Sequence, residues 1–281
     1  MGAQRGRGCE LDGIAELDRL AEDLGFESLW VPEHVVVPEH VESRYPFNAE
    51  GRLRSGPGEQ RPDPLMWLAF AAASTRQIRL ATGVLVLPLR NPVMLAKETA
   101  TLDWISGGRL ILGVGLGWMR EEFLALGSTW SDRAARADEY IAAMRALWNT
   151  TPSSFDGLTV SFRDVYCCPQ PWRNRIPIVI SGTSEAAARR AGRIGDGYLP
   201  MAVSANRLRE LLDVARAAAE EAGRDWDEIE VTYLGPPEQS MIDRMAGLGV
   251  DRYIVMDQDS AFAREPERLA AMAASLGVVP R

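Results

Sequence analysis

The sequence predicts an α/β fold that is built around a buried parallel sheet. Residues 78–87 and 109–114 are apolar on both strand faces, which is typical of strands that are covered on both sides. Between these runs, Asn91 is a suitable helix cap, and Pro92 suits the first helical position because no amide donor is needed there. A strand, a helix and a second strand in this order predict one right-handed βαβ unit.

The remaining elements follow from apolar periodicity along the chain. A stripe at helical spacing predicts a first helix that ends at Gly25, ahead of a first strand at 26–31. Further strands are predicted at 176–181, 197–201, 230–234 and 252–256. Further helices are predicted at 65–74, 119–126, 132–148, 184–194, 204–222, 237–248 and 265–276. The chain thus offers seven strands, and a helix precedes the first of them.

Length and composition favour one large domain. The chain has 281 residues, of which 46% are hydrophobic, enough to bury one barrel-sized core. We therefore expect a single domain over residues 1–281, with the polar, glycine-rich residues 1–10 disordered. Alternation around Asp156-Gly157 predicts a small hairpin within residues 150–175.

Charge and hydropathy argue against several classes of partner. The formal charge is -8 and no basic cluster is visible, so we expect no nucleic-acid partner. No apolar run reaches the roughly 20 residues of a membrane span, and the first residues lack the apolar core of a signal peptide. We therefore expect a cytoplasmic protein without a membrane partner. The three cysteines fit neither a disulfide framework nor a zinc-site spacing, and we expect no metal.

A long stretch of the chain resembles a known family. Residues 81–118, ATGVLVLPLRNPVMLAKETATLDWISGGRLILGVGLGW, resemble the bacterial-luciferase-like monooxygenase superfamily, and most closely its branch of coenzyme F420-dependent oxidoreductases. The resemblance continues through residues 121–148 and 176–200, and it covers most of the chain from about residue 17 to residue 200. It implies a TIM-type (β/α)8 barrel, a small-molecule substrate and a homodimer.

The order of elements departs from this family in one respect. The family has a strand just before the first helix, and that strand is missing or truncated here. A start codon placed too far downstream, a lost strand, and a poor substitute in residues 1–10 all remain open as explanations. An open barrel exposes two strand edges, which proteins usually cover.

A long loop follows the first predicted strand. Residues 32–64 are rich in Pro, Gly, Arg and Glu and show little periodicity. Loops of more than about 15 residues in a compact domain are usually functional lids or disordered. Since loops after barrel strands lie on the catalytic face, we interpret residues 35–62 as an active-site loop. The resemblance places an insertion at residues 150–175.

Glu33 and His34 are the candidate catalytic residues. They follow the strand at 26–31, and an imidazole beside a carboxylate at a barrel mouth suits proton transfer. An ordinary solvated loop pair explains them equally well. The resemblance favours function, because deazaflavin-dependent relatives have an acidic residue followed by His at this place. We expect His40 to face solvent.

Gly83 and Val84 are candidate cofactor-binding residues. A glycine within a buried strand usually marks a bulge or a close approach of another group, although a plain strand glycine is commoner. The resemblance implies a bulge with a cis peptide bond between Gly83 and Val84, behind the flavin ring.

Gly115 and Trp118 lie in the glycine-rich run at 113–118. Its G-x-G pattern is weak support for dinucleotide binding, and glycines that allow close approach of a ring fit better. Trp118 either contacts the substrate or fills the top of the barrel. Some deazaflavin-dependent dehydrogenases have an acidic residue here, so Trp118 argues against a sugar-phosphate substrate.

The last candidate cofactor site combines two segments, 182–184 and 195–197. Backbone amides at a helix N-terminus bind anions, and barrels often hold phosphate there, although Thr183 or Ser184 also suits an ordinary helix cap. The family binds its cofactor phosphate in this region. We therefore expect binding by Gly182, Thr183, Ser184, Gly195, Asp196 and Gly197.

Three functions are compatible with these patterns. The first is hydride transfer between coenzyme F420 and an unidentified small organic substrate. The second is an FMN-dependent monooxygenase, and the third is a non-catalytic flavin-binding member of the family. A phosphate-sugar barrel enzyme without flavin is a more distant alternative.

Overall fold

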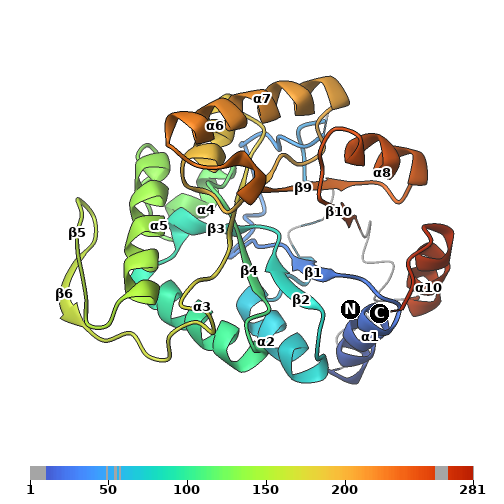
Figure 1. Ribbon diagram of the computed structural model, residues 1–281, viewed down its shortest axis with the longest axis horizontal. Helices are drawn as coiled ribbons and strands as arrows, with labels where there is room; N and C mark the ends of the chain where they lie inside the picture. The colour runs from blue at the N-terminus through green and yellow to red at the C-terminus, as the bar shows by residue number, and fades with distance from the viewer. Residues whose placement is uncertain (1–10, 49, 54–55, 57, 257–264, 281) are drawn as a thin grey trace.

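A computed structural model describes residues 11–48, 50–53, 56, 58–256 and 265–280. One parallel sheet winds nearly into a barrel, with helices around it (Figure 1). Its strands are, in spatial order, β1 (Ser28–Val31), β2 (Arg79–Thr82), β4 (Leu110–Gly115), β7 (Ile178–Ser181), β8 (Gly197–Leu199), β9 (Glu230–Gly235) and β10 (Arg252–Val255). A short strand, β3 (Leu85–Val86), also pairs with β4. All seven predicted strands are confirmed, and the predicted run at 78–87 divides into β2 and β3.

The helices lie on the outer face of this sheet. They are α1 (Leu11–Asp23), α2 (Pro64–Ser74), α3 (Pro92–Ser106), α4 (Arg120–Ala125), α5 (Arg133–Asn149), α6 (Glu185–Ile194), α7 (Ala205–Glu221), α8 (Gln239–Ala246) and α10 (Pro266–Ser275). Two short 3-10 helices, η2 (Leu87–Leu89) and η3 (Trp226–Glu228), are also present among the described residues. The predicted start of α3 is confirmed, since the Asn91 side chain accepts hydrogen bonds from the amides of Val93 and Met94.

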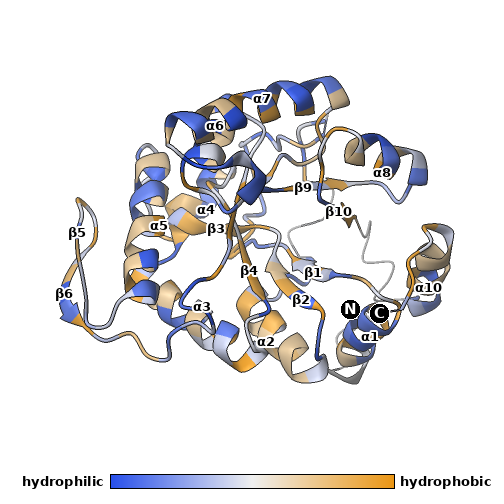
Figure 2. Ribbon diagram, viewed as in Figure 1, coloured by the Kyte–Doolittle hydropathy of each residue, from blue (hydrophilic) through white to orange (hydrophobic). Residues whose placement is uncertain are grey.

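Alternate residues of each strand face two different apolar layers. Leu80 and Leu110 pack towards the helices in the main core, whereas Ala81 and Ile111 face the barrel interior. The strands and the inward sides of the helices are accordingly hydrophobic (Figure 2). The interior layer contains Ala81, Ile111, Val179 and Leu199, flanked by the partly buried Trp30, Val84, Met201, Leu234 and Ile254.

The predicted hairpin is confirmed and lies apart from the barrel. Strands β5 (Ser153–Asp156) and β6 (Ser161–Val165) pair in antiparallel fashion and extend past α5 (Figure 1). This hairpin belongs to the stretch that we interpret as an insertion. None of the helices in the described ranges is long and apolar enough for a transmembrane segment.

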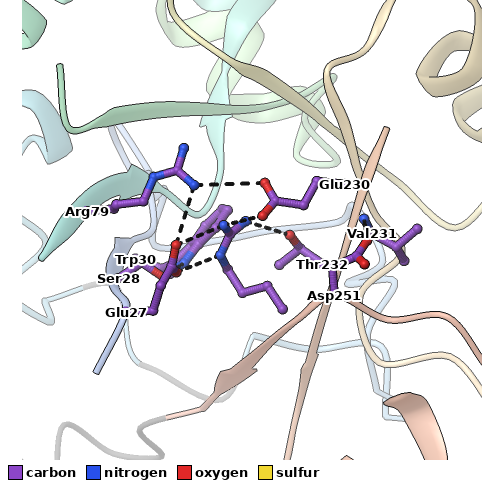
Figure 3. Close-up of polar contacts among 9 residues, drawn as sticks. Glu27, Ser28, Trp30, Arg79, Glu230, Val231, Thr232 and Asp251 are labelled. Carbon is purple, nitrogen blue, oxygen red and sulfur yellow. Dashed lines mark hydrogen bonds and ion pairs between the residues drawn. The ribbon is translucent and has the colours of Figure 1, made fainter. Parts of the chain in front are cut away.

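The sheet order ends at β1 on one side and at β10 on the other, and no strand of the described residues lies between them. Charged side chains bridge this seam at the amino ends of the strands (Figure 3). Arg252 of β10 donates hydrogen bonds to Glu27, next to β1, at 2.7 and 3.0 Å, and also to Glu230 of β9. Arg79 of β2 lies 3.4 Å from Glu27. The prediction of disorder for 1–10 lies outside the described residues.

Candidate active site

The strands are parallel, so their carboxyl ends meet at one end of the barrel. His34 follows β1, Val84 separates β2 from β3, Trp118 follows β4, and Gly182 follows β7. Four of the predicted site segments therefore share the face on which barrel enzymes hold their substrates.

His34 is held by a carboxyl group from another part of the chain. Its Nδ1 lies 3.2 Å from Oε2 of Glu122, in the first turn of α4. The other oxygen of Glu122 accepts hydrogen bonds from the amides of Val35, at 2.6 Å, and Val36, at 3.3 Å. Glu122 is buried, whereas 13% of the His34 side chain is exposed. The imidazole is thus fixed at one nitrogen and keeps some access from outside.

Aromatic rings cover one side of His34. The Trp118 ring lies edge-on to the imidazole, with 5.7 Å between ring centroids. Tyr45 of the loop contacts Trp118 with 5.1 Å between centroids, and Phe47 follows at 5.4 Å from Tyr45. The predicted active-site loop therefore contributes two rings beside the predicted substrate residue. His40 is exposed, as predicted.

The Glu33 side chain enters a buried ion pair with Arg90, whereas His34 binds Glu122, so the catalytic role of Glu33 stays a prediction. Oε1 of Glu33 accepts from Arg90 Nε at 3.0 Å, and its Oε2 accepts from the Val86 amide at 2.5 Å. Arg90 also binds Asp63 at 2.5 Å. Burial raises the pKa of Glu33 although Arg90 opposes that shift. Adjacent residues in an extended segment point to opposite sides, and only His34 faces the site.

The predicted cis peptide bond between Gly83 and Val84 is present. A Cβ at Gly83 would lie 3.3 Å from the Trp30 side chain, so the glycine packs closely on an interior ring. Gly115 is required by packing, since its Cβ would lie 2.9 Å from Cγ2 of Val84. Gly115 thus supports Val84, whereas we expected it to give a ring direct access.

Residues 182–184 form the start of α6. Ser184 caps this helix, since its side chain accepts a hydrogen bond from the Ala187 amide at 3.2 Å. Gly182 has φ of 147°, and its Cβ would lie 2.6 Å from Cβ of Ala187. Glu185 pairs with Arg189 at 2.8 Å, which offsets its negative charge in the first turn. The segment is therefore a capped helix N-terminus at the carboxyl face.

The structure does not bring residues 195–197 together with residues 182–184, so binding of the cofactor by residues 195–197 stays an untested prediction. Helix α6 runs antiparallel to the strands and returns the chain to the amino face before β8 begins at Gly197. Asp196 accepts a hydrogen bond from the amide of Ile178, the first residue of β7, at 2.9 Å. These residues therefore lie at the end of the barrel opposite to Gly182. The two segments are close in sequence, which suggested a shared site. The intervening helix α6, however, runs from the carboxyl end of the barrel to its amino end and so separates them.

The sequence analysis missed the acidic pair at the start of α4. Glu121 accepts hydrogen bonds from the amides of Glu42, at 2.7 Å, and Ser43, at 2.9 Å, while Glu122 binds the loop beside His34. Desolvation opposes ionisation of Glu121, but these hydrogen bonds prevail and lower its pKa to about 2. In the sequence, the two acidic residues in the first helical turn after residues 113–118 were the only pattern that could have indicated these contacts. They explain how the long loop is fixed over the barrel.

Comparison with known proteins agrees with this geometry. Residues 2–237 match the model of the luciferase-like monooxygenase family. An uncharacterized protein of Mycobacterium tuberculosis is 34% identical over 259 residues, which cover 90% of this chain and 91% of the relative. An F420-dependent glucose-6-phosphate dehydrogenase of Amycolatopsis mediterranei is 28% identical over 262 residues, which cover 89% of this chain and 74% of the relative.

The fold has close structural neighbours. A solved F420-dependent secondary alcohol dehydrogenase, in complex with an F420-acetone adduct, aligns with a TM-score of 0.76 at 19% identity. The alignment covers 96% of this chain and 94% of the neighbour. The protein is therefore a barrel of the luciferase-like type. It belongs to the luciferase-like monooxygenase family, and its relatives include F420-dependent enzymes.

Proposed function

We propose that the protein is an oxidoreductase that transfers a hydride between coenzyme F420 and a small organic substrate. The observation that carries this proposal is the fixed imidazole of His34 at the carboxyl end of β1, while the cis peptide bond at Gly83-Val84 follows the neighbouring strand β2. The family and the F420-dependent relatives support the same class of reaction.

The carboxyl face fits a flat ring with an anionic tail. The barrel interior below Val84 is apolar, with Ala81, Ile111 and Val179, and so suits the face of an aromatic ring system. Gly182, Thr183 and Ser184, which lead into α6, suit a phosphate, because the helix dipole and the amides of a helix N-terminus attract anions. When bound, the deazaflavin supplies hydride chemistry that side chains lack.

His34 is the residue that we assign to proton handling. Because Glu122 accepts at Nδ1, that nitrogen carries a hydrogen, and Nε2 is left to give or take a proton. Trp118 and Tyr45 exclude water from one side of the imidazole and offer an apolar surface to the substrate. Glu33 acts indirectly, by holding Arg90 and the Val86 amide next to the cis bond.

A second candidate is an FMN-dependent monooxygenase, since the matching family is described by that activity. The same face would hold FMN, and the two functions differ in whether oxygen is consumed. A non-catalytic flavin-binding role is the third possibility, and it requires that His34 be dispensable.

We further propose a homodimer. Met66 of α2, Met94 of α3 and Leu124 of α4 are large apolar side chains exposed on the surface of the described chain. Exposed apolar side chains on neighbouring helices are typical of protein interfaces. The cytoplasmic location stays a prediction from sequence.

Anaerobic turnover tests the proposed function. The protein is mixed with F420 and a panel of alcohols and aldehydes, and with reduced F420 and a panel of ketones and enones, while F420 absorbance is followed. We expect F420 oxidation or reduction with at least one panel. In a parallel aerobic assay, oxygen consumption with reduced FMN above the protein-free rate, together with no change of F420 in the anaerobic assay, would favour the monooxygenase.

A further inference from the structure

A polar cavity lies at the end of the barrel opposite to the candidate active site. It has a volume of about 360 Å³ and opens among the C-terminal ends of α5 and α6 and the residues after α7. Four guanidinium groups line it, against one carboxyl group. They are Arg145, Arg175, Arg193 and Arg224, with Asp196 as the carboxyl group. This positive site is notable in a chain with a formal charge of -8.

Asp196 is already saturated by its neighbours. One oxygen accepts from Arg175 at 2.5 Å, and the other accepts from Arg145 and from the Ile178 amide, both at 2.9 Å. Its side chain is 8% exposed, so this buried carboxyl group holds the guanidinium groups of Arg145 and Arg175 in place. A guanidinium group has five N–H donors. Bonds among the described residues use only one donor each of Arg145 and Arg175, so donors remain for a further acceptor.

The other two arginines keep their charge at the same cavity. Arg224 donates to the carbonyl groups of Gly192, at 2.6 Å, and Gly195, at 2.7 Å, and so caps α6. Arg193 donates to Asp138 at 2.6 Å, outside the cavity. Arg193 thus pairs with a full negative charge, whereas carbonyl groups carry partial charges only, so the hydrogen bonds of Arg224 do not balance its charge.

Repulsion among these groups is visible at Arg224. Burial lowers the pKa of this guanidinium, and the positive charges of Arg145 and Arg175 lower it further, although Asp196 and Glu228 oppose the shift. A bound anion would relieve this concentration of like charge. The positive charges that line the cavity are therefore not balanced by the single carboxyl group among the lining residues.

The geometry points to a binding site for a small, multiply charged oxyanion, of the phosphate or polycarboxylate type, on the amino face of the barrel. Planar guanidinium groups bind two oxygens of such an anion at once, which makes arginine clusters selective for them. The site is separate from the proposed cofactor site and does not depend on the proposed function.

Calorimetric titration of the full chain without cofactor tests this site. Inorganic phosphate, pyrophosphate and citrate are compared at constant ionic strength with sodium chloride as the reference anion. We expect saturable binding, strongest for the more highly charged anions. Pyrophosphate binding without citrate binding would assign a phosphate ligand, and the reverse would assign a polycarboxylate.

Substitution locates the binding. Arg175→Gln removes a guanidinium group that is 64% exposed, so the fold should survive, and we expect affinity to fall at least about tenfold. Arg193→Gln, at a side chain that is 54% exposed, provides a second test, and Arg209→Gln on the exposed surface of α7 is the control. The assignment would be overturned if the heat of titration with each oxyanion equalled that with chloride. It would also be overturned if both cavity variants bound the anions with unchanged affinity.

Discussion

At the scale of single residues, the proposed proton handling depends on His34 and on its contact with Glu122. The two residues are 88 positions apart in the chain, and the carboxyl group fixes both the ring and the loop that follows it. His34 was predictable because it follows a strand that ends at the barrel mouth. Glu122 was not, because its role depends on a tertiary contact that no local pattern encodes.

We predict that His34→Ala lowers kcat/KM by a factor of about 100 to 10,000, the usual contribution of a positioned proton donor or acceptor. Cofactor affinity should change far less, because the ring and phosphate are assigned to other residues. Steady-state kinetics and cofactor titration check both parts. His40→Ala, in the exposed part of the loop, is the matched control. Equal activity of the two variants would remove His34 from the reaction.

At the scale of elements, glycines set how closely strands and loops approach each other. Gly113 in β4 is an example, since its Cβ would lie 2.1 Å from the carbonyl oxygen of Thr82 in β2. The sequence predicted β2 and β4 as neighbours from the βαβ pattern. It did not predict that this glycine is required, because the contact is set by the curvature of the sheet.

We predict that Gly113→Ala destabilises the protein by about 3 kcal/mol or more, since a backbone carbonyl cannot move aside as a flexible side chain does. Chemical denaturation followed by circular dichroism measures the effect. Gly247→Ala, at a helix end where the nearest atom is 3.5 Å from the new Cβ, should be nearly neutral. A Gly113 variant as stable as the Gly247 variant would contradict this packing.

The directions of the elements explain why residues 195–197 and 182–184, which we expected to share one site, lie at opposite ends of the barrel. Sequence patterns located α6 and both flanking glycine segments correctly, but they do not state at which end of a strand each segment lies. That follows only from the alternation of strand and helix directions. Applied strictly, this alternation assigns Gly182 to one face and Gly197 to the other.

At the scale of the whole molecule, the seam between β1 and β10 is held by charge. Arg252, of which 7% of the side chain is exposed, joins Glu27 and Glu230 and lies over the Trp30 ring at 5.9 Å. Desolvation opposes ionisation of Glu27, yet the hydrogen bond and charge of Arg252 lower its pKa to about 2. A depressed carboxyl pKa stabilises the folded state above the unfolded value of 4.5, and this contribution is lost as pH falls towards 2.

We predict that Arg252→Met lowers the free energy of unfolding at pH 7 by about 2 to 3 kcal/mol, because it removes the buried arginine that joins Glu27 and Glu230 and leaves them only the more distant Arg79. The variant should also lose part of the acid dependence of stability between pH 4.5 and pH 2. Urea denaturation across this pH range tests both effects. Arg268→Met, on the exposed surface of α10, is the control. An Arg252 variant with unchanged stability would show that the seam is held by other contacts.

Asp18 has the opposite effect on stability. It lies buried on α1, and desolvation raises its pKa to about 6 from 3.8 despite a hydrogen bond with Trp67. A raised pKa means that the folded state holds the proton more tightly, so stability is full below pH 3.8 and falls as pH rises through 6.

We therefore predict that Asp18→Asn stabilises the protein at pH 8 by up to about 3 kcal/mol, with little effect at pH 4. Thermal unfolding at both pH values measures the difference. Asp23→Asn, at the exposed end of α1, should show no such dependence. Equal effects at pH 4 and pH 8 would contradict a buried, proton-binding Asp18.

Much of the fold was predictable from sequence, since strands that are buried on both faces and capped helices leave strong local patterns. The barrel type and the cis bond came from the family resemblance. The orientation of Glu33, the contacts of Glu122 and the arginine cavity were not predictable, because each depends on residues that meet only after the barrel winds.

We propose that the carboxyl face binds F420 in preference to FMN. Parallel titrations of the purified protein with the two cofactors, followed by fluorescence quenching, measure this preference. We predict micromolar affinity for F420, on the order of 1 to 100 µM as is usual for small ligands, and much weaker binding of FMN. Preference for FMN, or no binding of either cofactor by the folded protein, would contradict the claim.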